Sequence, residues 1–193
     1  DWDFMVDNTH FEARLVFNNA KLNNTGAENT DADGNVLSLL SVSGDGALRI
    51  IARGESTLTS LTTYVIHTAM VGGTTYTSEN GGKLTANKSG TPLGTAVAET
   101  VGKLTLDNAN LRVLNRAQNK NWPSIILSAA KDMQIIGGKL ELVATNYSIR
   151  AIHVEGNLTL EDYALVTIKQ TSTSSKEFIG VSGRPGREMY RYG

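Results

Sequence analysis

The sequence predicts an all-β fold: a single-stranded, right-handed parallel β-helix, or solenoid, with about six to seven turns of 25–33 residues. Three observations lead to this fold class. Leu, Val, Ile and Thr alternate with polar residues in short runs, which is typical of strands. The 19 glycines, with many Thr, Ser and Asn residues, indicate a chain that turns often. Similar phrases also recur along the chain at nearly regular intervals.

The clearest repeat is the pair RLVFNNAKLNN at 14–24 and KLTLDNANLRV at 103–113, in which Leu15 and Leu104 are 89 positions apart. Matching strands begin near positions 15, 48, 76, 104, 133 and 158, at separations of 25–33 residues. We therefore expect the two phrases three turns apart on one ladder. A further strand is expected ahead of these starts, in segments 36–42, 64–70, 124–130 and 148–154, with 178–181 beginning an incomplete turn.

Alternation along each strand places every second side chain inside the coil. A β-sandwich uses similar strands, but it does not require the same turn residues at the same offset. Right-handed winding is expected because crossovers between parallel strands are overwhelmingly right-handed. The expected inward residues are Leu104, Leu106, Met133, Ile135, Leu158 and Leu160, and the expected outward residues are Thr105, Gln134 and Thr159.

Composition excludes several classes of protein. The net charge is −1, from 18 basic and 19 acidic residues, so no basic excess favours nucleic acid or an anionic membrane surface. Because there are no cysteines, disulfide scaffolds and thiol catalysis are excluded.

We expect one domain over 1–193, with an N-terminal cover at 1–12, turns at 13–182 and a tail at 183–193. The opening DWDF, without an initiating Met, predicts a piece of a longer chain.

The segments SIRAIHVEGNLTLEDYALVTI and SIILSAAKDMQIIGGKLELV give the sequence a family likeness. They resemble the pectate-lyase-like right-handed β-helix repeats of bacterial cell-surface and adhesin-type proteins, over about residues 10–182. The resemblance implies the solenoid fold and an extracellular or cell-surface location. That family includes polysaccharide lyases, glycoside hydrolases, glycan-binding modules, phage tailspikes and inert stalks, so fold alone does not select a function.

Two aromatic residues precede matching strands in neighbouring turns. Trp122 and Tyr147 are 25 positions apart, and on a solenoid they are expected on one edge. Flat aromatic surfaces with adjacent hydrogen-bonding groups are suited to sugar rings, and Asn121, Asn146 and Arg150 supply such groups. The alternative is that both rings cap the core or shield a turn.

A calcium site is the second candidate. Asp31, Asp33 and Asn35 stand at alternate positions in DADGN, as in the start of an oxygen-ligand calcium loop. The following VLSLLSV supplies no further acidic ligand, which leaves only Glu28 nearby. The alternative is a polar turn that uses Asp, Gly and Asn for their local geometry.

Catalytic groups are the third candidate. Asp107, Glu161 and Asp162 follow the same strand at matching offsets, and a hydrolase needs two carboxyl groups about 5 to 10 Å apart. The intermediate turn has Ile136 at that position, which interrupts the column. Asp also suits turns. The remaining candidate groups are two histidines, His67 in segment 64–70 and His153 in segment 148–154. Strand alternation places both on the outside, as ordinary surface residues.

The sequence therefore favours a non-catalytic surface β-helix, adhesin-like, that binds a glycan or a protein partner or acts as a spacer. Its expected partners are a polysaccharide or a host or cell-surface protein, without nucleic acid or membrane insertion, and calcium is the only ion considered. One alternative is a polysaccharide lyase or glycoside hydrolase of the same fold. Another is a segment of a structural fibre or phage tailspike.

Overall fold

The computed structural model describes residues 12–24, 38–61, 64–89, 96–116, 124–145, 148–171, 177–183 and 189–191. Every regular element in these ranges is a β-strand. The strands are β1 Glu12–Asn18, β2 Lys21–Asn24, β3 Leu40–Gly44, β4 Ala47–Ser60, β5 Ile66–Met70, β6 Thr74–Lys88, β7 Ala98–Thr100, β8 Leu104–Asp107, β9 Asn110–Asn115, β10 Ser124–Ala129, β11 Met133–Ile136, β12 Lys139–Ala144, β13 Ser148–Val154, β14 Leu158–Glu161, β15 Leu165–Gln170, β16 Glu177–Gly183 and β17 Met189–Arg191.

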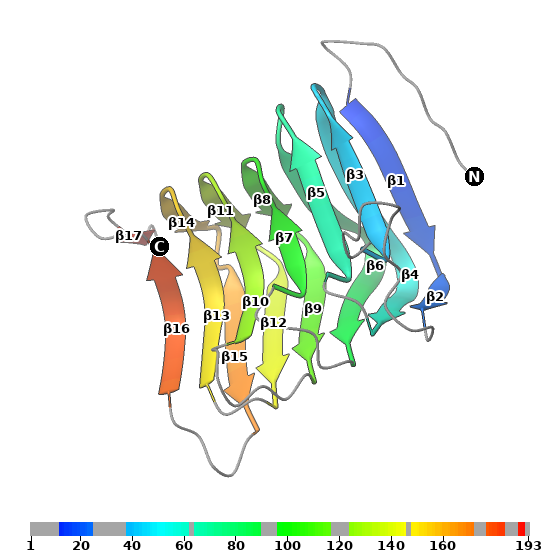
Figure 1. Cartoon of the computed structure of the whole chain (residues 1–193). Coiled ribbons are helices and arrows are strands. Elements are labelled where there is room, and N and C mark those ends of the chain that lie inside the picture. The colour runs from blue at the N-terminus through cyan, green and yellow to red at the C-terminus, as the bar shows by residue number, and fades with distance from the viewer. Residues whose placement is uncertain are drawn as a thin grey trace, which may run out of the picture.

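The strands form a parallel β-solenoid, which confirms the predicted fold class. One sheet has six strands in the order β16-β13-β10-β7-β5-β3, and an 11-stranded sheet holds the others. Each strand pairs in parallel with its counterparts in the preceding and following turns. Figure 1 shows the strands stacked as a ladder whose colours follow the chain from one end to the other.

A complete turn has three strand segments, one in the six-stranded sheet and two in the larger sheet. In the middle of the chain these are separate strands, such as β7, β8 and β9. Nearer the N-terminus, β4 and β6 are 14 and 15 residues long and each serves both segments of the larger sheet. Within the described residues the first and last turns are partial, so complete turns are somewhat fewer than the six to seven predicted.

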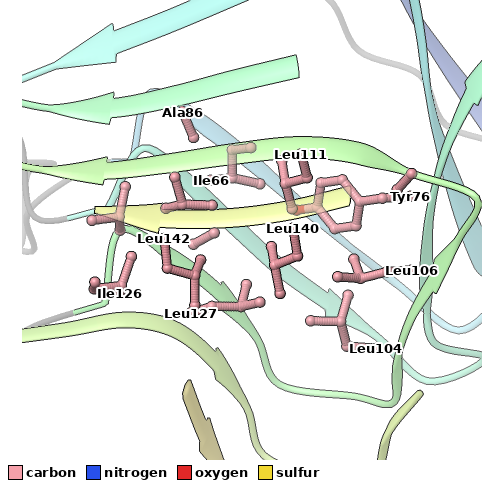
Figure 2. Packing of buried hydrophobic residues seen from close by; sticks show 14 of the residues in the cluster. Ile66, Tyr76, Ala86, Leu104, Leu106, Leu111, Ile126, Leu127, Leu140 and Leu142 are labelled. Atoms are coloured by element: carbon pink, nitrogen blue, oxygen red, sulfur yellow. The ribbon is translucent and has the colours of Figure 1, made fainter. Parts of the chain in front are cut away.

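The interior is a column of aliphatic side chains, as alternation predicted. Leu104, Met133 and Leu158 are in register in β8, β11 and β14, and each is at most 3% exposed. The residue two positions later in each strand continues the core. Figure 2 shows Leu104, Leu106, Leu111, Leu140 and Leu142 directed into the same space. The outward Thr105, Gln134 and Thr159 form one row, as expected.

The two phrases do lie three turns apart, but their predicted register is wrong by two residues. Leu15 aligns through Ile50 and Tyr76 with Leu106, and not with Leu104. The long strands β4 and β6 accommodate the extra residues. Since side chains alternate with a period of two, a shift by two leaves every inward residue inward. The sequence pattern is therefore the same in both registers.

Other strand predictions have mixed outcomes. The five segments expected ahead of the starts correspond to β3, β5, β10, β13 and β16. A sixth strand, β7, was not predicted because its three residues AET carry no apolar run. The tail expected at 183–193 contributes β17, which pairs with β14 and extends the ladder.

Candidate functional site

The described surface has a shallow polar groove of about 290 Å3 on the outer side of β6, β9, β12 and β15. These strands are consecutive neighbours in the larger sheet. Because stacked strands are about 4.8 Å apart, four of them give the groove a length of roughly 14 Å. Its lining is Lys83, Asn110, Leu111, Arg112, Lys139, Leu140, Glu141, Leu165, Thr167 and Lys169.

Strand alternation explains why these side chains meet. Leu111 and Leu140 are in register and buried, so the residues on either side of them point outward. One outward row comprises Lys83, Asn110, Lys139 and Leu165, each in the position just before an inward residue. The next outward row comprises Thr85, Arg112, Glu141 and Thr167.

The groove is cationic. It holds four basic side chains and one carboxylate, which leaves a formal charge of +3. Glu141 Oε2 lies 2.9 Å from Arg112 Nε, in an ion pair without hydrogen-bond alignment, and Glu141 Oε1 lies 3.4 Å from Lys169 Nζ. Lys83 and Lys139 form no ion pair with any described residue. An anion in the groove would therefore meet two ammonium groups that no carboxylate of the described residues neutralises.

The sequence prediction did not single out this groove, although one signal was present. The motif GGKL occurs at 81–84 and again at 137–140. It places Lys83 and Lys139 at the same outward position two turns apart, with Asn110 between them.

The predicted aromatic site lies almost wholly outside the described residues. Trp122, Asn121, Asn146 and Tyr147 fall in undescribed segments. Arg150 is described: it is half-buried on β13, in register with Ile125 of β10. Its Nε is buried and has no hydrogen-bond partner among the described residues. That site remains a prediction.

The predicted calcium ligands Asp31, Asp33 and Asn35 also lie outside the described residues, as does Glu28. Across the part of the chain that the structure describes, no group of three or more His, Asp or Glu side chains is arranged to hold a metal ion. The described residues therefore supply no metal site, and the calcium loop stays an expectation.

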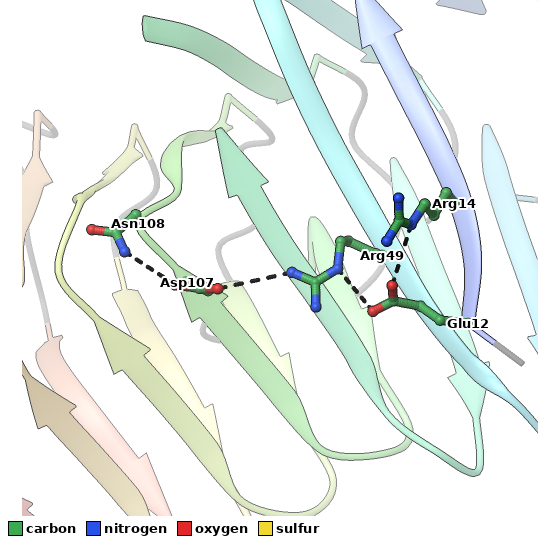
Figure 3. Close-up of polar contacts among 5 residues, drawn as sticks. All are labelled: Glu12, Arg14, Arg49, Asp107 and Asn108. Atoms are coloured by element: carbon green, nitrogen blue, oxygen red, sulfur yellow. Dashed lines mark hydrogen bonds and ion pairs between the residues drawn. The ribbon is translucent and has the colours of Figure 1, made fainter. Parts of the chain in front are cut away.

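The carboxylates Asp107 and Glu161 stand in one row with Ile136 between them, as the sequence predicted. Asp107 Oδ2 lies 3.8 Å from Arg49 Nη1, and Asn108 Nδ2 donates to Asp107 Oδ1 at 3.1 Å. Figure 3 shows this chain of polar contacts running from Arg14 through Glu12 and Arg49 to Asn108.

The structure also describes the other two candidate carboxylates, Glu161 and Asp162. Gln134 Nε2 donates to Glu161 Oε1 at 3.1 Å. Asp162 has a φ of 51° and belongs to a turn. Asp107 and Glu161 thus each contact a different polar neighbour. Between them the row has Ile136, which cannot act as an acid or a base.

The two histidines lie on the outer face of the six-stranded sheet, as expected. His67 Nε2 is 3.7 Å from Glu99 Oε2, and the ring of Tyr64 lies 5.3 Å from that of His67. Burial, followed by the charge of Glu99 and a hydrogen bond to it, raises the pKa of Tyr64 to about 12.

The same row continues across the sheet. Glu99 is in register with Ser128, which in turn is in register with His153. His153 Nδ1 and Ser182 Oγ are 3.0 Å apart. The row is a line of hydrogen-bonding side chains on a sheet face, rather than a cluster around one point.

A buried lysine lies inside the coil at the end of β6. Lys88 is 1% exposed and is in register with Ser60 and Asn115, which are also buried. Burial lowers the pKa of Lys88 from 10.5 to about 8. Because an enclosed ammonium is not accessible to a ligand, this polar stripe contributes to internal structure and stays separate from the groove.

Within the described ranges, no helix is long and apolar enough to cross a membrane. Comparison of the chain with protein-family models, with curated proteins and with solved structures finds no match. The chain is thus a parallel β-solenoid with a cationic groove across four of its strands. Any function for it has to be argued from its own residues.

Proposed function

We propose that this chain is a non-catalytic, adhesin-type β-solenoid that binds a carboxylated polysaccharide in the groove across β6, β9, β12 and β15. The observation that carries the proposal is the charge of the groove, with four basic side chains against one carboxylate. The whole chain has a net charge of −1, so this local excess is not a general property of its surface. Cationic side chains concentrated in a concave site favour an anionic ligand.

The shape of the groove favours a polymer over a small anion. At a length of roughly 14 Å it is open along the row of strands, whereas small-molecule sites enclose most of their ligand. Lys83 and Lys139 stand at one edge as separate point charges, and Arg112 offers the planar fork that pairs with a carboxylate. Asn110 and Thr167 supply hydrogen-bonding groups for sugar hydroxyls.

Binding is favoured over cleavage because the row of Asp107 and Glu161 is interrupted by Ile136. A hydrolase needs two carboxyl groups that act on one bond. The secreted or cell-surface location, and a relationship to the pectate-lyase-like repeats of bacterial surface proteins, belong to the same proposal. They are supported by the resemblance of the turns to those repeats.

Affinity electrophoresis tests the proposal. Gels are cast with polygalacturonate, alginate or hyaluronate, or with neutral hydroxyethylcellulose, each with and without calcium. We expect retardation by at least one acidic polysaccharide and none by the neutral one. The double variant Lys83→Ala, Lys139→Ala should lose it. The control Lys103→Ala, Lys131→Ala makes the same charge change at exposed positions outside the groove and should keep it.

Two results would contradict the proposal. One is equal retardation of the groove variant and the control variant, which would assign any binding to net charge alone. The other is unchanged mobility of the native chain in all three acidic gels.

A further inference from the structure

Tyr163 occupies a backbone conformation that aromatic residues rarely adopt. Its φ is 56°, in the left-handed region, and the preceding Asp162 has a φ of 51°. Ala164 N donates to Glu161 O at 3.2 Å, which closes a tight turn over these two residues. Turns with two consecutive left-handed residues strongly prefer Asn-Gly, Asp-Gly or Gly-Gly.

The other two described places with two consecutive left-handed residues follow that preference. The turn before β12 uses Gly137 and Gly138, with φ values of 58° and 69°. The corner within β6 uses Asn80 and Gly81, with φ values of 54° and 73°. Tyr163 is therefore the second residue of a left-handed pair, the position that is glycine in the other two pairs. An L-residue in this region costs about 1–2 kcal/mol, so the tyrosine is destabilising where it stands.

Packing against the described residues does not offset that cost. The residue is 97% exposed, so its ring contributes almost no buried apolar surface. Strained residues that packing does not require are concentrated at functional sites. An exposed aromatic residue in a strained turn therefore indicates a role in ligand binding.

The position of the turn indicates which ligand. Tyr163 lies two residues before Leu165, which lines the end of the groove and is itself 53% exposed. Leu165 is in register with Lys139 of the cationic row. The corner thus holds an exposed aromatic residue two positions along the chain from the lining of a polar, cationic site. Sugar rings have an apolar face of C–H groups that packs on such a surface, while their carboxylates and hydroxyls need the polar groups.

We propose that Tyr163 is the stacking platform of the groove: its ring packs against a sugar ring of the polysaccharide whose carboxylates pair with Lys83, Lys139 and Arg112. This inference rests on the proposed function and deepens it. The tyrosine lowers the conformational stability of the chain and raises its affinity for the polysaccharide. Replacement by a residue suited to the turn should therefore raise stability and weaken binding.

The test uses Tyr163→Gly, Tyr163→Asn and Tyr163→Phe in the full chain. Binding is measured by affinity electrophoresis in whichever of the polygalacturonate, alginate or hyaluronate gels retards the native protein. Stability is measured by thermal unfolding. Glycine and asparagine suit the left-handed region, so these variants should melt higher than the native chain, the glycine variant by roughly 2–4 °C. Both should bind roughly tenfold more weakly. Phenylalanine keeps the ring and should leave affinity within about twofold.

The outcomes separate this inference from the proposed function. If the glycine variant melts higher and binds as the native chain does, while Lys83→Ala, Lys139→Ala loses binding, the platform is wrong and the groove stands. If the glycine variant melts lower, Tyr163 has a structural role and the inference is overturned. If the native chain binds none of the three acidic polysaccharides, the proposed function and the platform are both wrong.

Discussion

The side-chain oxygen of Asn108 lies 2.6 Å from the point that a β-carbon would occupy at Gly137. Both residues have left-handed backbone, with φ values of 48° and 58°, and they stand at the same corner of neighbouring turns. Asn19 and Gly54 form the same contact at the other end of the solenoid, where Asn19 Oδ1 also accepts a hydrogen bond from the amide of Glu55 at 3.1 Å. The Asn that the two phrases share, Asn19 and Asn108, therefore marks a corner at which the following turn needs glycine.

Gly137→Ala should lower the free energy of unfolding by more than Gly81→Ala does. Both replacements carry the left-handed penalty of about 1–2 kcal/mol. A β-carbon at Gly81 meets no atom within 4 Å, whereas one at Gly137 must displace Asn108. Urea unfolding of the two variants measures the difference. Equal losses would show that the contact between the two corners carries no energy.

Leu106→Ala should destabilise the chain by about 2–5 kcal/mol, because it leaves a cavity in the core column where Leu106 is 1% exposed. The control is Thr105→Ala in the same strand, whose side chain points outward and whose loss should cost less than about 0.5 kcal/mol. Both are measured by urea unfolding. Similar losses at the two positions would contradict the assignment of inward and outward faces.

Lys88 should make stability rise with pH. Its pKa is about 8 in the folded chain and 10.5 in its ordinary state, so between these values the unfolded chain binds more protons. The free energy of unfolding should therefore increase from pH 8 to pH 10.5, by up to about 3 kcal/mol from this group.

The matched variant is Lys88→Met, which keeps the length of the side chain and removes the charge. It should be more stable than the native chain at pH 7, and the advantage should shrink toward pH 10. Urea unfolding at both pH values measures the difference between the two proteins, which removes the contribution of other titrating groups. A constant difference would show that Lys88 stays protonated in the folded chain.

Glu141→Gln should strengthen binding to the acidic polysaccharide. It removes the one carboxylate of the groove and releases Arg112 and Lys169 from their ion pairs. These pairs are partly exposed, so stability should change by no more than about 1 kcal/mol. Affinity electrophoresis should show greater retardation than for the native chain, with the effect reduced by added salt. Weaker retardation would mean that Glu141 accepts hydrogen bonds from the ligand.

Particular residues show how far the sequence predicts the structure. The inward column of Leu104, Met133 and Leu158 was predicted because a strand exposes alternate residues to the core. The register at Leu15 was not, since a shift by two residues leaves that alternation unchanged. The strand β7 was missed because three residues are too few to show a pattern.

By itself, the sequence determined that this chain is a stack of short parallel strands, and which side chains face the core. Alternating hydrophobicity can be read along a single strand, and repeated turn residues can be read by comparing segments of the sequence. Only the tertiary structure decided which turns align and hence which outward residues are neighbours. Lys83, Arg112, Lys139 and Lys169 come from four successive turns, and parallel stacking joins them into one groove. The same stacking places Leu165, two residues after Tyr163, in the lining of that groove.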